Sequence, residues 1–517
     1  MTDEGVQLEA TNAKEARAPF SFSTSATLLT DAGDLSLERA DRTGDLRVLL
    51  RISGPIIVAT ISQTLMRFVD FAMVSGLGTE AQAAVGASGV TLFVLIGFWI
   101  GLMSCVNTFA SQALGRNEPH ECGAYVWQAV YLSVAAGVLA LPLWPAVPPL
   151  FVFFAHGSGV VPLEIIYMQI GLLSVGPFAA EVALSNFFNG VHRPRVTMVS
   201  AIGANAFNVL ADYVLIYGKW GFPRMGVAGA SLATTLSMTF RSVWLLVVML
   251  LPYYAARFST RSGWRWDWNR TRNLLRVGLP AGGQFVMDIL AWSVFMMWLI
   301  GRFGPRHLAA TNIVWQFLHL SFMPALGIGI GLTAVVGKAI GERRPDKARR
   351  RARVAMALCG TYMASCGLMF FLLRTFFVGL FNDDPVVLRI GEHLMICGAI
   401  FQLFDAMCLV YSSSLRGAGD TVWPAVALVI ACWVILIGGG YTIVQVAPQW
   451  GALGPWIAAT AYVIVLGLVL AARWSRGAWE KINIFADPSG SPAPVGRAAC
   501  EKALACGEVD HGRQDEL

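Results

Sequence analysis

Long apolar stretches dominate the pattern of this chain. No Asp, Glu, Lys or Arg occurs in residues 81–115, 122–163 or 421–472, which are 35, 42 and 52 residues long. A helix that crosses a bilayer needs about 20 apolar residues, so stretches of this length must cross more than once. Continuous apolar runs also exclude the short alternating strands of a membrane barrel. The pattern therefore predicts transmembrane helices.

Twelve spans account for the apolar segments, which makes the predicted fold an all-α polytopic membrane protein with two pseudo-symmetric lobes of six helices each. An even number of spans returns the chain to its starting side. We place the spans roughly at residues 50–75, 85–113, 123–146, 163–188, 196–217, 226–253, 276–301, 308–338, 354–378, 388–414, 422–446 and 452–473.

An internal repeat of about 226 residues supports this division. Leu-Leu-Arg-Ile-Ser-Gly-Pro ends at Pro55, and Leu-Leu-Arg-Val-Gly-Leu-Pro ends at Pro280. Gly115 and Gly341 are separated by the same period. Transporters commonly place their substrate site between two such repeats. The predicted segments are a tail 1–46, a first lobe 47–255, a cytoplasmic linker 256–275, a second lobe 276–475 and a tail 476–517.

Composition narrows the function. Hydrophobic residues make up 56% of the chain, charged residues only 14%, and the mean hydropathy is +0.59. These values exclude a soluble enzyme, a disordered protein and a nucleic-acid-binding domain. Residues 1–46 and 478–517 are acidic and polar, without apolar periodicity, so both tails are expected to be disordered. The first 46 residues also lack the apolar core of a signal peptide.

Orientation follows from the basic residues of the short loops. One set of loops carries 17 Lys or Arg residues and the opposite set carries 6. Because basic loops stay in the cytoplasm, we expect a multi-pass protein of the plasma (inner) membrane with both termini in the cytoplasm. The expected surroundings are a lipid bilayer and no nucleic acid, and the fold would permit a monomer.

Catalytic and metal-binding patterns are missing. The seven histidines are scattered, and none pairs with another His at helical spacing. The nine cysteines form no Cys-x-x-Cys pair or zinc spacing. We therefore expect no enzyme activity, no cofactor and no metal other than Na⁺ as a coupling ion.

Among the carboxylates inside predicted spans, where ionisable groups are costly and point to function, four form two pairs at common depths. Asp70 and Asp212 lie at similar depths in the first lobe, and Asn208 is one helical turn before Asp212. Asp288 and Asp405 share a level in the second lobe. Paired carboxylates suit either a proton or a sodium ion, and the second pair suits a cation or a positively charged substrate.

The alternative reading is that each acid is neutralised by a neighbouring base. Arg67 is one turn before Asp70, and Arg241 lies in the middle of the sixth span. Aromatic and Met side chains near the second pair could line a cavity for lipophilic cations. The candidate lining residues are Trp292, Met296 and Phe401.

From about residue 47 to 475, the chain resembles the multidrug and toxic compound extrusion (MATE) family. The resemblance rests on residues 68–78, 208–212, 226–234 and 414–421. It implies two six-helix lobes and efflux coupled to inward proton or sodium flow. The first-lobe cation residues of the family match Asp70, Asn208, Asp212 and Thr234.

Members of the NorM branch also use two second-lobe acids, and these positions match Asp288 and Asp405. Asp288 stands where the branch usually has Glu, and Phe401 stands where it typically has Tyr. Arg67 replaces the small or apolar residue expected beside Asp70.

The predicted function is a secondary active antiporter that exports organic compounds, cationic or amphipathic, in exchange for H⁺ or Na⁺. The alternative is a lipid-linked oligosaccharide flippase of the same wider superfamily, although twelve spans and an acid-rich interior argue against it. A major facilitator fits less well, because the loop at residues 115–122 lacks the basic motif of those carriers.

Overall fold

The computed structural model describes residues 42–154 and 157–485, and these are helical, with no β-strand among them. Within these ranges, eleven helices are long and apolar enough to cross a membrane. A bent pair, with an angle of 48° between its helices, makes twelve spans if it counts as one. The predicted fold class is confirmed. Most of each predicted tail, residues 1–41 and 486–517, lies outside the described residues.

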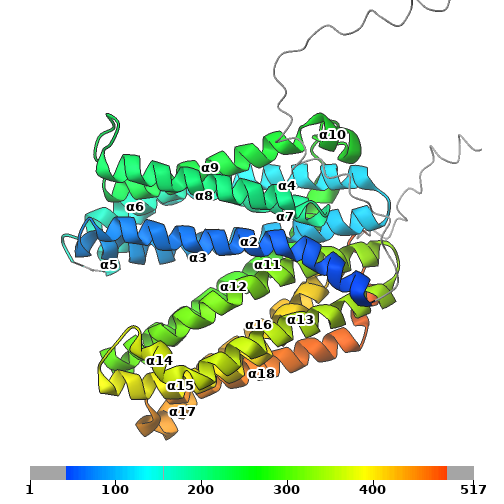
Figure 1. The fold of residues 1–517 in the computed structure, drawn as a ribbon. Coiled ribbons are helices and arrows are strands. Elements are labelled where there is room, and N and C mark those ends of the chain that lie inside the picture. Colours follow the sequence, from blue (N-terminus) through cyan, green and yellow to red (C-terminus); the bar gives the residue numbers. More distant parts are fainter. Residues whose placement is uncertain (1–41, 155–156, 486–517) are drawn as a thin grey trace, which may run out of the picture. The chain divides into compact units, whose positions relative to one another are not determined.

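The first lobe contains six spans (Figure 1). Its fourth span is the bent pair α6 and α7, where sequence predicted one helix over 163–188. The elements are α2 (Arg42–Ser75), α3 (Thr79–Gly115), α4 (Pro119–Ala140), a 3₁₀ segment (Leu141–Ala146), α5 (Val147–Phe154), α6 (Val161–Leu172), α7 (Val175–Gly190), α8 (Pro194–Tyr217), α9 (Val227–Met249) and α10 (Pro252–Phe258).

The second lobe repeats this plan, and π-helical segments interrupt two of its spans. Its elements are α11 (Trp268–Val294), a π segment (Phe295–Ile300), α12 (Pro305–Gly341), α13 (Pro345–Leu372), α14 (Arg374–Gly379), α15 (Pro385–Ala418), α16 (Val422–Ala431), a second π segment (Cys432–Gly439), α17 (Gly440–Val446) and α18 (Leu453–Ser475). Helices also extend into the predicted tails, since residues 42–46 belong to α2 and Ala478–Lys481 forms a 3₁₀ turn.

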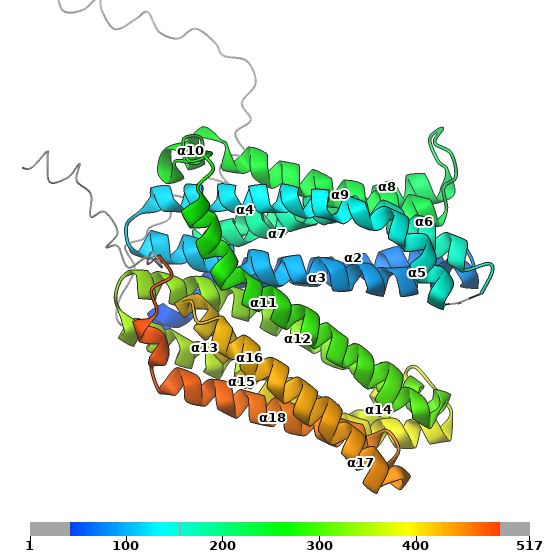
Figure 2. The same ribbon diagram turned by 180° about the vertical axis from the view of Figure 1, so that it is seen from behind.

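The six-helix plan brings the basic loops to one end of the helices, which we call the basic end. It contains the start of α2, the end of α18 and the connections at residues 116–118, 191–193, 251–267, 342–344 and 419–421. The two groups of helices lie close together at this end and separate toward the other (Figures 1 and 2).

The duplication is visible in helix lengths and turn conformations. Helices α3 and α12 both contain 37 residues, and α9 and α18 both contain 23. The turns after α3 and α12 place Asn117 and Arg343 in the left-handed region, with φ of 59° and 56°. Two sequences with little identity therefore fold into the same backbone frame.

Close glycine contacts join the lobes along α3 with α11 and along α2 with α12. A Cβ added to Gly101 would lie 2.3 Å from the Ala281 carbonyl oxygen. At the basic end, a Cβ added to Gly115 would lie 3.0 Å from the Gly341 Cα and 2.1 Å from the Lys338 carbonyl oxygen. The repeat-related glycines thus face each other where the lobes approach most closely.

Side-chain donors on α3 reinforce this junction. Asn107 donates to the Ile330 carbonyl at 3.1 Å. Thr108 donates to the Arg416 carbonyl and Gln112 donates to the Gly417 carbonyl, both at 2.9 Å. The described contacts therefore close the junction between the lobes at the basic end.

Candidate functional site

Two parallel helices, α2 and α8, create the first-lobe site. The Asn205 amide donates to the Ser62 hydroxyl at 2.7 Å, and the Tyr217 hydroxyl donates to the Met73 carbonyl at 2.8 Å. Both helices run away from the basic end, so these bonds fix their register. Asp70 and Asp212 lie between the two bonds, on facing helices.

The Asp70 and Asp212 carboxyl groups interact directly, at hydrogen-bonding range. As two carboxylates they have no donor between them, because each can only accept. Both Asp212 oxygens, one Asp70 oxygen and the whole Asn208 amide are buried without a hydrogen-bond partner among the described residues. Like charges in contact cannot both persist unless a proton or another cation lies between them.

Arg67 and Thr234 are the other residues predicted for the first-lobe site, and their contacts differ. The Arg67 guanidinium interacts electrostatically with Asp70 and lies 5.6 Å from the centre of the Phe93 ring. The Thr234 hydroxyl donates to the Ala230 carbonyl of its own helix at 3.0 Å. Arg67 is therefore a charge neighbour of the acid pair, whereas the Thr234 hydroxyl is engaged by its helix backbone.

Arg241 is occupied elsewhere. Its guanidinium forms a buried ion pair with Glu181 of α7, and the two side chains are only 6% and 8% exposed. It therefore pairs with Glu181 rather than with Asp70 or Asp212. Sequence reasoning missed this partnership because 60 residues separate the two groups. The available signal was that each is a charged residue inside an apolar span.

The second lobe holds its acids on α11 and α15. Asp405 and Asp288 interact electrostatically, and the Trp292 indole lies near the Asp288 carboxyl. The Asp288–Trp292 spacing is one helical turn, so α11 itself presents both groups to the same place. This pair therefore has an indole N–H nearby, where the first-lobe pair has the Arg67 guanidinium.

Aromatic rings surround the second-lobe acids. The Trp292 ring centre is 6.1 Å from that of Phe401, 4.6 Å from that of Trp315 and 6.3 Å from that of Tyr462. Met296 packs against the same core. Two of the three predicted lining residues, Trp292 and Phe401, thus contact each other in an aromatic cluster.

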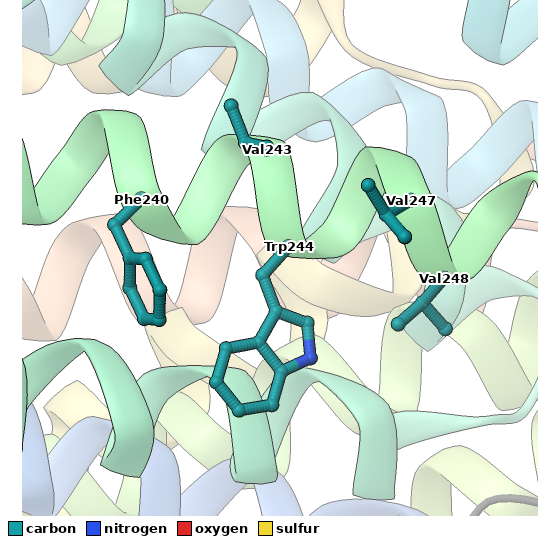
Figure 3. Close-up of a pocket in the computed structure, with 5 residues that line it drawn as sticks. All are labelled: Phe240, Val243, Trp244, Val247 and Val248. Atoms are coloured by element: carbon teal, nitrogen blue, oxygen red, sulfur yellow. The ribbon is translucent and has the colours of Figure 1, made fainter.

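An apolar hollow on the first lobe lies away from these acids. It is lined entirely by α9 side chains and is open (Figure 3). The side chains of Val243 and Val247 there are 52% and 55% exposed. With no polar lining residue, the hollow fits an acyl chain of the bilayer better than it fits a coupling site. Its lining residues are Phe240, Val243, Trp244, Val247 and Val248.

A duplicated twelve-span frame with paired acids in each lobe is the architecture of a secondary transporter. The MatE family model matches residues 55–214 and 285–442, one segment in each lobe. The chain belongs to the MatE family and is a membrane transporter.

The chain is similar to proteins named probable multidrug resistance protein NorM. The Mesorhizobium japonicum protein is 28% identical over 460 residues, covering 86% of this chain and 97% of its own length. The Pseudomonas aeruginosa protein is 28% identical over 443 residues, covering 83% and 89%.

Solved structures share the fold. A MOP superfamily transporter from Pyrococcus furiosus has a TM-score of 0.77 at 22% identity, covering 85% of this chain and 97% of its own. The outward-facing conformation of a multidrug resistance MATE family transporter gives the same TM-score, identity and coverage.

Proposed function

We propose that the protein is a secondary active antiporter that exports organic compounds, cationic or amphipathic, in exchange for H⁺ or Na⁺. The observation that carries the proposal is the donor-free contact between Asp70 and Asp212 beside the unpartnered Asn208 amide. Arg67 supplies one positive charge to the two carboxylates, so a bound proton or sodium ion would offset the second negative charge and couple cation binding to the packing of α2 against α8. A shared proton satisfies the two carboxyl groups directly, and a sodium ion would use the same oxygens together with that of Asn208.

The basic end faces the cytoplasm in this proposal, in a plasma membrane, with both chain ends on that side. The excess of basic residues in the loops at that end supports this orientation. The contacts between the lobes then close the cytoplasmic side, so the described conformation faces outward. Binding of the coupling cation in the first lobe would loosen the substrate, and a monomer would suffice for the cycle.

The second-lobe acids with their aromatic neighbours are the proposed contact for the positive charge of a substrate or for a second cation. Cation–π attraction by Trp292 and the charges of Asp288 and Asp405 favour lipophilic cations. The names of the curated relatives support multidrug efflux. They favour it over the lipid-linked oligosaccharide flippase.

Efflux of a cationic dye from proteoliposomes tests this function, with a pH gradient and a sodium gradient imposed separately. Asp70→Asn and Asp212→Asn should each abolish gradient-driven efflux, because an amide cannot release a proton or bind a cation as strongly. Asp346→Asn is the matched control, since Asp346 is an exposed acid at the basic end. Full coupled efflux in both cluster variants would refute the site. Loss in Asp405→Asn alone would move the coupling to the second lobe.

A further inference from the structure

The ten residues that follow the last span contact both lobes. This segment, residues 476–485, leaves α18 and turns back across the basic end (Figure 2). We call it the strap. The sequence predicts a disordered tail for these residues, yet Trp479 is fully buried and Ile484 is 6% exposed. Such burial so soon after a final span requires docking surfaces on the helices.

The first part of the strap is fixed to the second lobe. The Trp479 ring stacks on that of Trp474 with centres 4.2 Å apart, and its indole donates to the Trp474 carbonyl at 2.8 Å. Glu480 forms an ion pair with Arg349 of α13 at 2.6 Å. Beyond it, Ile484 lies against Gly419, where an added Cβ would approach its side chain to 2.3 Å.

The end of the strap reaches the first lobe. The Phe485 ring lies edge-on to Phe109 of α3 and Tyr125 of α4, with centres 5.7 Å and 5.6 Å away. Phe109 and Tyr125 stack on each other at 4.5 Å. The Arg116 guanidinium lies 4.3 Å from the Phe485 ring centre, within cation–π range.

The aromatic site that binds Phe485 lies next to the junction between the lobes. Phe109 and Arg116 flank Gln112, whose amide bonds to Gly417 of the second lobe. Gly417 is two residues before Gly419, on which Ile484 packs. The strap thus covers the same junction from outside, tying α18 and α15 of one lobe to α3 and α4 of the other.

We propose that the strap is a latch that holds the two lobes together at the basic end, with Phe485 as its removable contact on the first lobe. The role of this latch in alternating access rests on the proposed function. The contact between the strap and the first lobe does not rest on the proposed function, because it follows from the positions of Phe485, Phe109 and Tyr125 alone. Separation of the lobes at this end must pull Phe485 from its aromatic seat or carry the strap away from Trp474.

Spin-label distances between the lobes test the latch in the full-length protein. One label is placed at Ser262, in the linker that Gln128 of α4 holds through the Arg265 carbonyl at 2.9 Å. The other is placed at the exposed Asp346 of α13, in a background whose native cysteines are replaced by serine. Phe485→Ala should raise the ratio of separated to closed lobes about tenfold, because two aromatic contacts and a cation–π contact are lost.

Lys481→Ala is the matched control, since Lys481 is an exposed strap residue, and Phe485→Tyr should retain the closed distribution. Arg116→Ala should have a smaller effect that disappears in the Phe485→Ala background, because both changes remove the same contact. Identical distance distributions for Phe485→Ala and Lys481→Ala would overturn the latch. Dye efflux in the same variants is measured separately, so a failed antiporter assay leaves the distance result interpretable.

Discussion

Replacing either glycine of the facing pair by alanine should open the basic end. A Cβ at Gly115 would lie 2.1 Å from the Lys338 carbonyl oxygen, and a Cβ at Gly341 would lie 2.1 Å from the Gln112 carbonyl oxygen. The obstructing atoms are backbone, so no rotamer change relieves them. Alanine itself suits a helix at least as well as glycine, so the lobes should fold as before.

The size of the effect follows from these distances. Restoring ordinary contact requires α3 and α12 to move apart by about 1 Å at this end, and such overpacking typically costs about 1–3 kcal/mol. This free-energy cost destabilises only the closed conformation, because the added methyl group no longer meets the opposite backbone once the lobes separate. The ratio of open to closed protein should therefore rise by roughly 5- to 150-fold.

A native cysteine reports this opening. Cys105 is 1% exposed, and its thiol lies on the Leu274 carbonyl of α11 at 3.7 Å, across the junction. In protein that retains Cys105 alone, Gly115→Ala should speed labelling by a membrane-impermeant maleimide in proportion to the open fraction. Gly283→Ala is the control, because an added Cβ there meets nothing within 4 Å. Equal labelling rates for the two variants would refute the reasoning.

Three further predictions concern single charges. Glu181→Gln should destabilise the protein by about 3–5 kcal/mol in thermal or denaturant unfolding, because Arg241 is left charged and buried, and adding Arg241→Gln should recover much of the loss. Arg67→Leu should lower the cation concentration for half-maximal efflux, because a positive charge beside Asp70 is removed; an unchanged value would contradict this. The Val386 backbone N–H donates to the Asp384 carboxylate and lowers the pKa of that group. The ionised Asp384 therefore stabilises the folded protein above the ordinary carboxyl pKa, and this stabilisation is lost as pH falls through the lowered pKa. The melting temperatures of wild type and Asp384→Asn should therefore converge only in acid.

Apolar run length predicted the helices because it depends on residues close in sequence, and the repeat of about 226 residues predicted the division into two lobes. The lone departure in span number comes from the fourth span, which bends by 48° between α6 and α7. Pro177 is the sign of this break, because a proline has no N–H to donate to the carbonyl four residues earlier, here that of Leu173. The prediction of a single helix over 163–188 did not take it into account. The depth of Asp70 and Asp212 could be estimated by counting residues along each helix, and the structure places them side by side.

Partners across the fold were harder to predict. Arg241 was considered as a neutralising base for the first-lobe acids, yet it pairs with Glu181. Helix periodicity assigns a residue to a depth and a face, but it does not say which neighbouring helix that face meets. The strap was missed for a similar reason: its few apolar residues are too short a pattern to suggest burial, and their docking rings lie on α3 and α4.

The internal repeat distinguishes features that both lobes share, which belong to the backbone, from features carried by individual side chains. At the repeat spacing, Asp70 corresponds to Met296 and Asp288 corresponds to Ser62. The lobes thus share helix lengths, turn conformations and glycine contacts, but not their acids. A symmetric frame suits a motion in which one lobe rocks against the other, since equivalent surfaces meet at the junction. Because the acids are not duplicated, a cation that binds Asp70 and Asp212 acts on the first lobe alone. Its binding can therefore change how the first lobe packs against the second, which an equal change in both lobes would not do.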